Sequence, residues 1–94
     1  MAERLPDAEI SERLSSRPGW DLVDGKLHRE LRFDDFVSAF GFMASVAITA
    51  EKMNHHPEWS NVYSTVVVDL STHDAGGVTE LDFELAEKID TLAG

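Results

Sequence analysis

Three of the four histidines in this chain lie in two short segments that also carry acidic and aromatic side chains. The segments are Glu51-Lys-Met-Asn-His55-His56-Pro57-Glu-Trp59 and Ser71-Thr-His73-Asp74. An imidazole titrates near neutrality, so neighbouring histidines could donate and accept protons in one reaction. An indole offers a flat apolar face to a planar ring. The residue types therefore indicate acid–base chemistry on a flat polar heterocycle.

A long helix should precede the first segment. From Asp34 onward, apolar side chains recur every three or four residues until about Met53, and the residue before Pro57 avoids helical angles. The apolar positions are Phe36, Val37, Phe40, Met43, Ala44, Ala47, Ile48 and Ala50. One side of a small sheet cannot cover so much apolar surface. We therefore expect a homo-oligomer, a dimer or tetramer, that uses this helix or an edge strand.

Two strands should join the two histidine segments. Residues 58–63 and 65–71 read as extended chain with a tight connection between them. In such a hairpin, the end of the second strand returns to the start of the first. This geometry predicts that His73 lies close to Trp59 and to the histidine pair, at a place where loops on a rigid sheet often form sites.

The remaining elements complete one domain that spans residues 1–94. Residues 6–14 read as a short helix, and Asp24-Gly25 is a favoured two-residue hairpin turn. Thr79 and Asp82 have the spacing of a capping box at the start of a final helix. The side chains expected to be buried on that helix are Leu81, Leu85, Ile89 and Leu92. The order α-β-β-α-β-β-α predicts an α+β fold with helices packed on one face of a four-stranded antiparallel sheet.

Composition excludes several classes of function. A chain of 94 residues encloses a single core, and its 18 acidic against 8 basic residues disfavour direct binding to nucleic acid. The absence of cysteine excludes disulfides, thiol nucleophiles and cysteine zinc sites. No apolar run reaches the roughly 20 residues of a membrane span, and the first residues do not resemble a signal peptide. We expect a soluble, cytoplasmic protein without a membrane partner.

The same residues also have simpler explanations. Histidines before a proline are often solvated turn residues, a tryptophan is more often core or interface, and Asp74 can shape a turn beside two glycines. Three histidines could also ligate zinc. However, neighbours such as His55 and His56 in extended chain point in opposite directions, and neither His-x-His nor HExxH spacing is present. The residue types alone leave these alternatives open, although no metal is expected.

The two segments together resemble the pterin-4a-carbinolamine dehydratase family. That family is marked by a helix ending in a Glu/Lys-rich turn, then His-His-Pro-x-Trp-x-x-Val-Tyr, then a strand ending in Thr-His. This chain carries those features at residues 51–63 and 70–74, and the segments 40–43 and 81–86 are also similar. The resemblance covers roughly residues 20–89. Where many relatives have a cysteine two residues after the third histidine, this chain has Ala75, and no acid or base role depends on that position.

The resemblance implies a hydro-lyase that needs no cofactor. Its substrate would be the 4a-carbinolamine, 4a-hydroxytetrahydrobiopterin, that aromatic amino-acid hydroxylases leave behind, and its product would be quinonoid dihydropterin for tetrahydrobiopterin recycling. His55 and His73 would be the acid–base pair, and His56 would mainly bind the pterin. The further residues that would shape or bind the site are Glu51, Pro57, Trp59 and Asp82.

Some members of this family also act as a dimerisation cofactor of a homeodomain transcription factor. A non-catalytic interaction module is therefore the alternative function, and its partner would contact the apolar stripe of the helix at residues 34–53. In a host without aromatic hydroxylation, the same site could act on another pterin.

Overall fold

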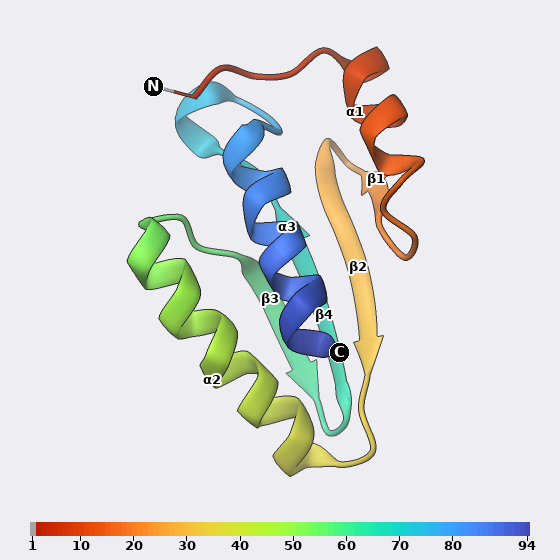
Figure 1. Ribbon diagram of the computed structural model, residues 1–94, viewed down its shortest axis with the longest axis vertical. Helices are drawn as coiled ribbons and strands as arrows, with labels where there is room; N and C mark the ends of the chain where they lie inside the picture. The colour runs from red at the N-terminus through yellow and green to blue at the C-terminus, as the bar shows by residue number, and fades with distance from the viewer. Residues whose placement is uncertain (1) are drawn as a thin grey trace.

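Residues 2–94, the part of the chain that this computed structural model describes, form three α-helices, one short 3-10 helix and a four-stranded antiparallel sheet (Figure 1). The helices are α1 (Asp7–Leu14), α2 (Phe36–Met53) and α3 (Glu80–Ala93), with the 3-10 helix η1 at His73–Ala75. The strands are β1 (Asp21–Val23), β2 (Lys26–Arg32), β3 (Glu58–Val62) and β4 (Thr65–Leu70). The predicted α+β class and element order are confirmed.

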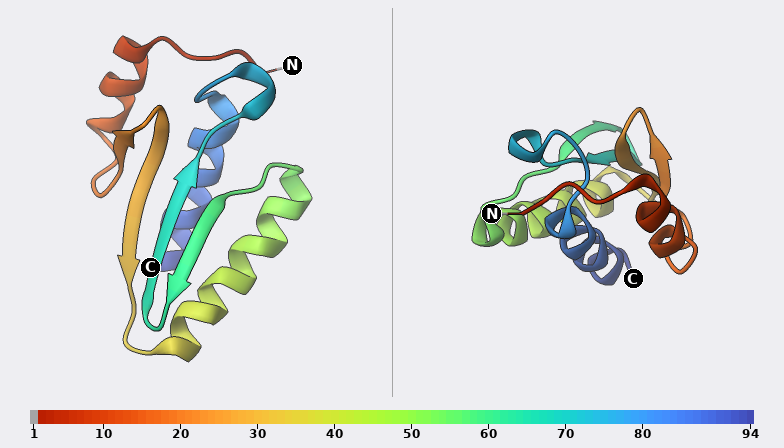
Figure 2. Two further views of the ribbon diagram at one scale, coloured as in Figure 1. Left: turned by 180° about the vertical axis from the view of Figure 1, so that it is seen from behind. Right: turned by 90° about the horizontal axis from the view of Figure 1, so that it is seen from above.

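The sheet has the strand order β1-β2-β4-β3, so β4 lies between β2 and β3. The β2–β4 pairing extends from Leu27 opposite Leu70 to Arg32 opposite Thr65. Helices α2 and α3 lie together on one face of the sheet, whereas α1 lies beside β1 at its edge (Figure 2). The expected covering of one sheet face by helices is therefore present.

Local signals set the ends of these elements. The Asp24–Gly25 turn has positive φ at both positions, 51° and 78°, as a type I′ hairpin turn requires. Helix α2 begins after Asp35, whose carboxylate accepts a hydrogen bond from the Ser38 N–H at 2.8 Å. It ends at Asn54, which adopts a left-handed conformation with a φ of 53°. His55 consequently begins the chain segment that leads into β3.

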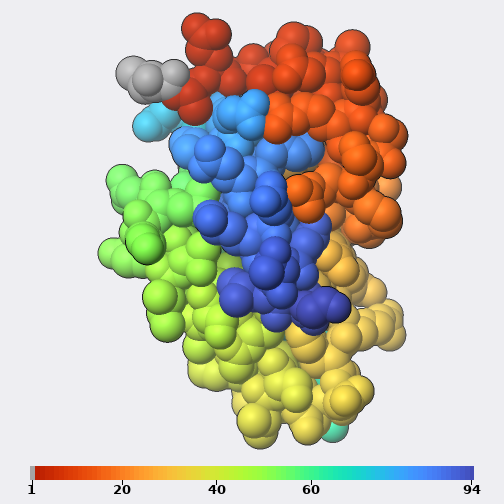
Figure 3. All heavy atoms as spheres, in the orientation of Figure 1, coloured from red at the N-terminus to blue at the C-terminus, as the bar shows by residue number. Residues whose placement is uncertain are grey.

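The core lies between the sheet and helices α2 and α3. Strand β4 contributes three fully buried side chains, Val66, Val68 and Leu70. On α3 the buried apolar side chains are Phe83, Leu85, Ala86 and Ile89. The prediction for α3 was right for Leu85 and Ile89, but Leu92 is exposed and Leu81 is half-buried. The difference arises because α3 lies between α2 and the β2 side of the sheet (Figures 1 and 3), so contacts on both sides determine which of its side chains are buried.

Helix α2 buries a different face from the one that its apolar spacing suggests. Its buried side chains are Ala39, Phe42, Val46 and Ala50. Large apolar side chains of the predicted stripe remain exposed: Phe36 at 47%, Val37 at 78%, Phe40 at 57% and Ile48 at 73%. The helix is apolar on nearly all sides, so its spacing alone could not select the face that contacts the sheet.

The apolar character of α2 also bears on the membrane expectation. Among residues 2–94, this helix is long and apolar enough to cross a membrane by length and composition, with a mean hydropathy of 1.2 over 18 residues. Core helices of soluble proteins meet the same criterion. One face of α2 packs against the core, and 22% of the helix is buried.

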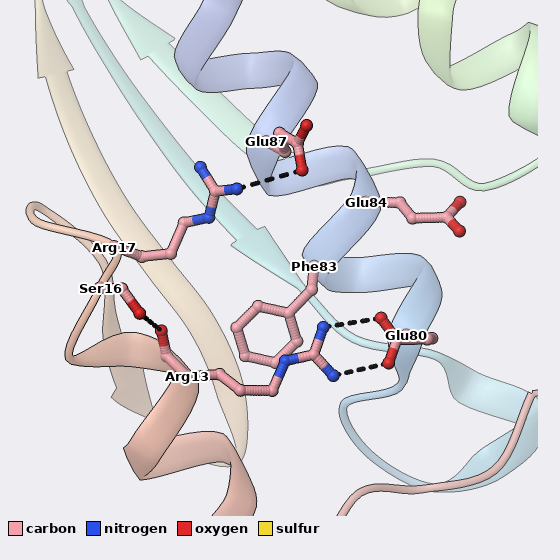
Figure 4. A pocket seen from close by; sticks show the side chains of 7 residues that line it. All are labelled: Arg13, Ser16, Arg17, Glu80, Phe83, Glu84 and Glu87. Carbon is pink, nitrogen blue, oxygen red and sulfur yellow. Dashed lines mark hydrogen bonds and ion pairs between the residues drawn. The ribbon is translucent and has the colours of Figure 1, made fainter.

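Charged side chains connect α1 to α3 (Figure 4). Arg13 donates hydrogen bonds of 2.6 Å to both carboxylate oxygens of Glu80, and its guanidinium lies 4.3 Å from the centre of the Phe83 ring. Arg17 donates to Glu87 at 3.2 Å across the same hollow, which has a volume of about 260 Å³. Arg13 of α1 and Arg17 just after it thus both bind carboxylates of α3. We call these contacts the clasp between α1 and α3.

Candidate active site

The two histidine segments meet at one end of the β3–β4 hairpin. Glu58, the first residue of β3, pairs with Asp69 near the end of β4, so η1 lies beside the chain that enters β3. A pocket of about 360 Å³ opens there, within the range of about 300–1,000 Å³ that is usual for small ligands. Its lining residues are Asn54, His55, His56, Pro57, Glu58, Ser71, Thr72, His73 and Asp74. The predicted proximity of His73 to the histidine pair is confirmed.

A second hollow of about 470 Å³ adjoins this pocket. The two share Ser71, Thr72 and His73, and the second is completed by the β1–β2 turn and two glycines of the loop before α3. His73 therefore stands between the two hollows.

His55 is the most enclosed of the pocket histidines, at 8% exposed. Its Nε2 lies 2.6 Å from Oδ1 of Asp82, a carboxylate with 0% exposure. The other oxygen of Asp82 accepts hydrogen bonds from the Thr72 hydroxyl at 2.9 Å and from the Thr79 N–H at 2.8 Å. These contacts fix the carboxylate, which in turn fixes the imidazole and leaves its Nδ1 for another partner.

The network around Asp82 contains the capping box predicted at the start of α3. Asp82, which was expected to shape or bind the site, is fully buried and absent from the pocket lining. Its carboxylate reaches the pocket through His55.

His56 forms a separate pair. Its Nε2 lies 2.8 Å from Oε1 of Glu51, which belongs to the last turn of α2. Both side chains are exposed, and Glu51 is not among the pocket-lining residues. Glu51 therefore contributes to the site by orienting a pocket histidine, and its contact with a pterin stays a prediction.

His73 lies on η1 and pairs with Glu58, whose Oε1 is 3.1 Å from the histidine Nε2. The other oxygen of Glu58 accepts a hydrogen bond from the Lys26 ammonium at 2.5 Å. Hydrogen bonds from Lys26, and secondarily from His73, hold the pKa of Glu58 below its usual value. The sequence analysis did not identify Glu58 or Lys26 as part of the site. The alternation of side chains along β3 could have indicated Glu58, because Glu58 faces away from Trp59.

Trp59 and Pro57 were both expected at the pterin site. Pro57 lines the pocket. Trp59 instead packs against the core, opposite the fully buried Val68, and is absent from the pocket lining. Side chains alternate along a strand, so Trp59 points to the helix-covered face when Glu58 faces the pocket. Within this single chain, Trp59 lies outside the pocket lining, and its contact with a pterin stays a prediction.

Each pocket histidine thus has its own carboxylate partner: Asp82 for His55, Glu51 for His56 and Glu58 for His73. Within residues 2–94, no group of three or more histidine, aspartate or glutamate side chains is arranged to hold a metal ion. The fold and the pocket together define a small α+β protein with a pocket lined by three histidines, each paired with a carboxylate.

Comparison with known proteins identifies the family. The model of the pterin 4 alpha carbinolamine dehydratase family matches residues 3–92, and the chain belongs to this family. A protein of Solibacter usitatus, provisionally assigned as a pterin-4-alpha-carbinolamine dehydratase, is 56% identical over 93 residues, covering 99% of this chain and 98% of its own. A protein of Jannaschia with the same provisional assignment is 54% identical over 97 residues, covering 99% of both chains. The resemblance seen in the motifs is confirmed.

Solved structures give the same fold. A crystal structure described as a transcriptional coactivator/pterin dehydratase from Brucella melitensis has a TM-score of 0.94 and 49% identity, covering 98% of this chain and 100% of that one. A pterin dehydratase-like protein, identified as a RuBisCO assembly factor in the alpha-carboxysome, has a TM-score of 0.66 at 21% identity, covering 80% of this chain and 87% of its own. The second likeness shows the fold alone, so the activity has to be argued from the site.

Proposed function

We propose that this protein removes water from a 4a-hydroxytetrahydropterin and releases quinonoid dihydropterin, a step of tetrahydrobiopterin recycling. The observation that carries the proposal is one pocket that brings together two differently held imidazoles. His55 is enclosed and bonded to the buried Asp82, and His73 is exposed and bonded to Glu58. Membership of the family supports a pterin as the substrate class.

The reaction needs two proton transfers. A proton must reach the hydroxyl oxygen on C4a so that it leaves as water, and another must leave a ring nitrogen so that the ring becomes neutral. A protonated imidazole performs the first transfer and a neutral imidazole the second. His55 and His73 come from the two segments that line the pocket, so together they supply both groups. His73 is exposed, which allows it to exchange protons with solvent between turnovers.

The test is a stopped-flow assay of synthetic 4a-hydroxytetrahydropterin with the purified protein. His55→Ala and His73→Ala should each slow turnover by about 10²–10⁴-fold, the usual contribution of general acid–base catalysis. His56→Ala should weaken binding of a stable pterin analogue more than it slows the chemical step. The control is His28→Ala, because His28 pairs with Asp69 outside the pocket lining. This substitution should leave rate and binding nearly unchanged. Equal, small effects from all four substitutions would show that the cluster is a solvated turn.

A second candidate function is a non-catalytic interaction module, such as the dimerisation cofactor of a transcription factor. The exposed apolar side chains of α2 favour it, and the Brucella protein is described in part as a transcriptional coactivator. A His55→Ala/His73→Ala double variant would retain such an interaction, whereas a charge on the α2 face would abolish it. Wild-type turnover that depends on both histidines would favour the enzyme.

A further inference from the structure

His73 needs a partner to hold it. Its side chain is 79% exposed and extends from η1, a single turn of three residues. Within residues 2–94, the side chain has one hydrogen-bond partner, Glu58. A proton-transferring imidazole has to stay within about 2.6–3.2 Å of the atom that it serves, and a displacement of about 1 Å can cost roughly 10²-fold in rate. The orientation of His73 therefore depends on how firmly Glu58 is held.

Glu58 is held from two directions. Its backbone starts β3 and pairs with Asp69 of β4, and its free oxygen accepts the 2.5 Å hydrogen bond from Lys26 at the start of β2. The chain Lys26–Glu58–His73 thus links β2, β3 and η1 around the end of β4. The hydrogen bond from Lys26 lowers the pKa of Glu58, and the one to Glu58 raises the pKa of Lys26, so both stay ionised near neutrality.

Stability alone does not account for this pair. Both side chains are more than a third exposed, and such surface ion pairs contribute only about 0–1 kcal/mol to folding. Yet Glu58 lines the pterin pocket, Lys26 lines the adjoining hollow, and His73 lines both. The Lys26–Glu58 pair therefore lies where it can fix the orientation of His73.

We propose that Glu58 is a positioning residue for His73 and that Lys26 anchors Glu58 in that role. The proposal rests on the proposed function. The Glu58 carboxylate accepts a hydrogen bond from Nε2–H of His73, which leaves Nδ1 of the ring for the proton in transit. When His73 takes up that proton, the adjacent carboxylate stabilises the imidazolium, and Lys26 keeps the carboxylate ionised.

The test compares three variants in the stopped-flow assay. Glu58→Ala should lower kcat by roughly 10- to 100-fold with KM changed by less than about threefold, because it displaces a catalytic group without removing a contact to substrate. Glu58→Gln, which keeps an acceptor, should recover part of the loss. Lys26→Met leaves Glu58 in place and should lower kcat less, in the same direction. Glu30→Ala is the matched control, since Glu30 lies on β2 and pairs with Arg32 outside the pocket.

A double-mutant cycle separates positioning from a structural role. Glu58→Ala combined with His73→Ala should be no slower than His73→Ala alone, since Glu58 acts through that ring. An unchanged kcat in Glu58→Ala, or a further loss in the double variant, would overturn the inference. If His73→Ala is slow while Glu58→Ala is normal, the proposed function stands and the positioning role falls. A wild-type protein without dehydratase turnover would contradict the proposed function itself.

Discussion

The three pocket histidines differ in how firmly the chain holds them. His55 is bonded to a carboxylate that is itself fixed by two further donors, whereas His56 and His73 rely on partners that solvent reaches. Hydrogen bonds inside a protein are stronger than the same bonds in water, so the His55–Asp82 pair should be the most rigid part of the site. Substitutions around it should affect folding and catalysis together.

Asp82→Asn should lower both stability and turnover. An amide has one oxygen acceptor, and Asp82 accepts from His55, Thr72 and Thr79 through two oxygens. One donor would lose its partner, which costs about 1–3 kcal/mol of unfolding free energy. The loss is measured by urea denaturation and the rate by stopped flow.

Thr79→Ala is the matched control for that substitution. It removes the helix cap, at about 1 kcal/mol, but leaves the His55–Asp82 bond in place. Its kcat should stay near the wild-type value despite the lower stability. If Asp82→Asn also turned over at the wild-type rate, the carboxylate would have no part in holding His55 for catalysis.

Removal of metal should not affect turnover. The two proton transfers need positioned imidazoles, and each pocket histidine already bonds its own carboxylate. The protein should keep full dehydratase activity after exhaustive chelation, measured beside an untreated sample. Stoichiometric zinc in the purified protein, together with loss of activity on its removal, would reverse this assignment.

At the scale of elements, local signals predicted the fold well. The Asp24–Gly25 turn, the end of α2 before Pro57 and the capping box of α3 each depend on residues close together in the chain, and each was right. The buried face of α2, by contrast, is not determined by residues close together in the chain. Ala39 and Phe42 face the core because the sheet lies on that side of the helix. Since α2 is apolar on nearly all sides, its sequence alone does not predict which face is buried.

The site was likewise predictable where short connections determine it, and unpredictable where distant segments meet. Hairpin geometry placed His73 beside His55, because the connection between their strands is short. The pairs that join distant segments were not predictable: Lys26 meets Glu58 across β4, 32 positions away. Trp59 was expected near His73 because of the hairpin geometry, but side chains alternate along β3, so Trp59 lies on the opposite face of the sheet from Glu58.

The clasp between α1 and α3 gives a prediction for acid stability. The bidentate hydrogen bonds from Arg13 hold the pKa of Glu80 below its ordinary value of 4.5. A lowered folded-state pKa stabilises the fold fully above about pH 4.5, and this contribution is lost as the pH falls through the folded-state pKa. Glu80 is 60% exposed, so the contribution should be at most about 1 kcal/mol.

Urea denaturation of wild type and Glu80→Gln measures that contribution. Wild type should be more stable near neutral pH, and the two proteins should converge once the pH falls below the lowered folded-state pKa of Glu80, where the carboxylate is protonated. Glu12→Gln on α1 is the control, because the Glu12 side chain forms no ion pair within residues 2–94 and the substitution should change little. A difference between wild type and Glu80→Gln that persists in acid would contradict an ionic clasp.

At the scale of the whole molecule, a small core and a bare apolar helix face occur together. A domain of 94 residues buries only part of its apolar surface, and such domains are commonly stabilised by association. The exposed side chains Phe36, Val37, Phe40 and Ile48 lie on α2, away from the pocket lining. Association through this face would cover them and leave the histidine pocket open.

We therefore predict a homo-oligomer, a dimer or tetramer, that uses the exposed face of α2. Light scattering at micromolar concentration should give a mass above that of the 10.4 kDa chain. Val37→Asp should shift the protein toward the monomer, because it buries a charge in the interface. Val37 is 78% exposed and lies in the first turn of α2, where a negative charge suits the helix dipole, so circular dichroism should show an intact fold.

Val62→Asp distinguishes this interface from association through the edge strand. Val62 is 76% exposed at the end of β3, the outer strand of the sheet. If the α2 face forms the contact, Val62→Asp stays oligomeric while Val37→Asp dissociates; if the β3 edge forms it, the two results exchange. A wild-type protein that is monomeric at micromolar concentration would contradict the predicted homo-oligomer.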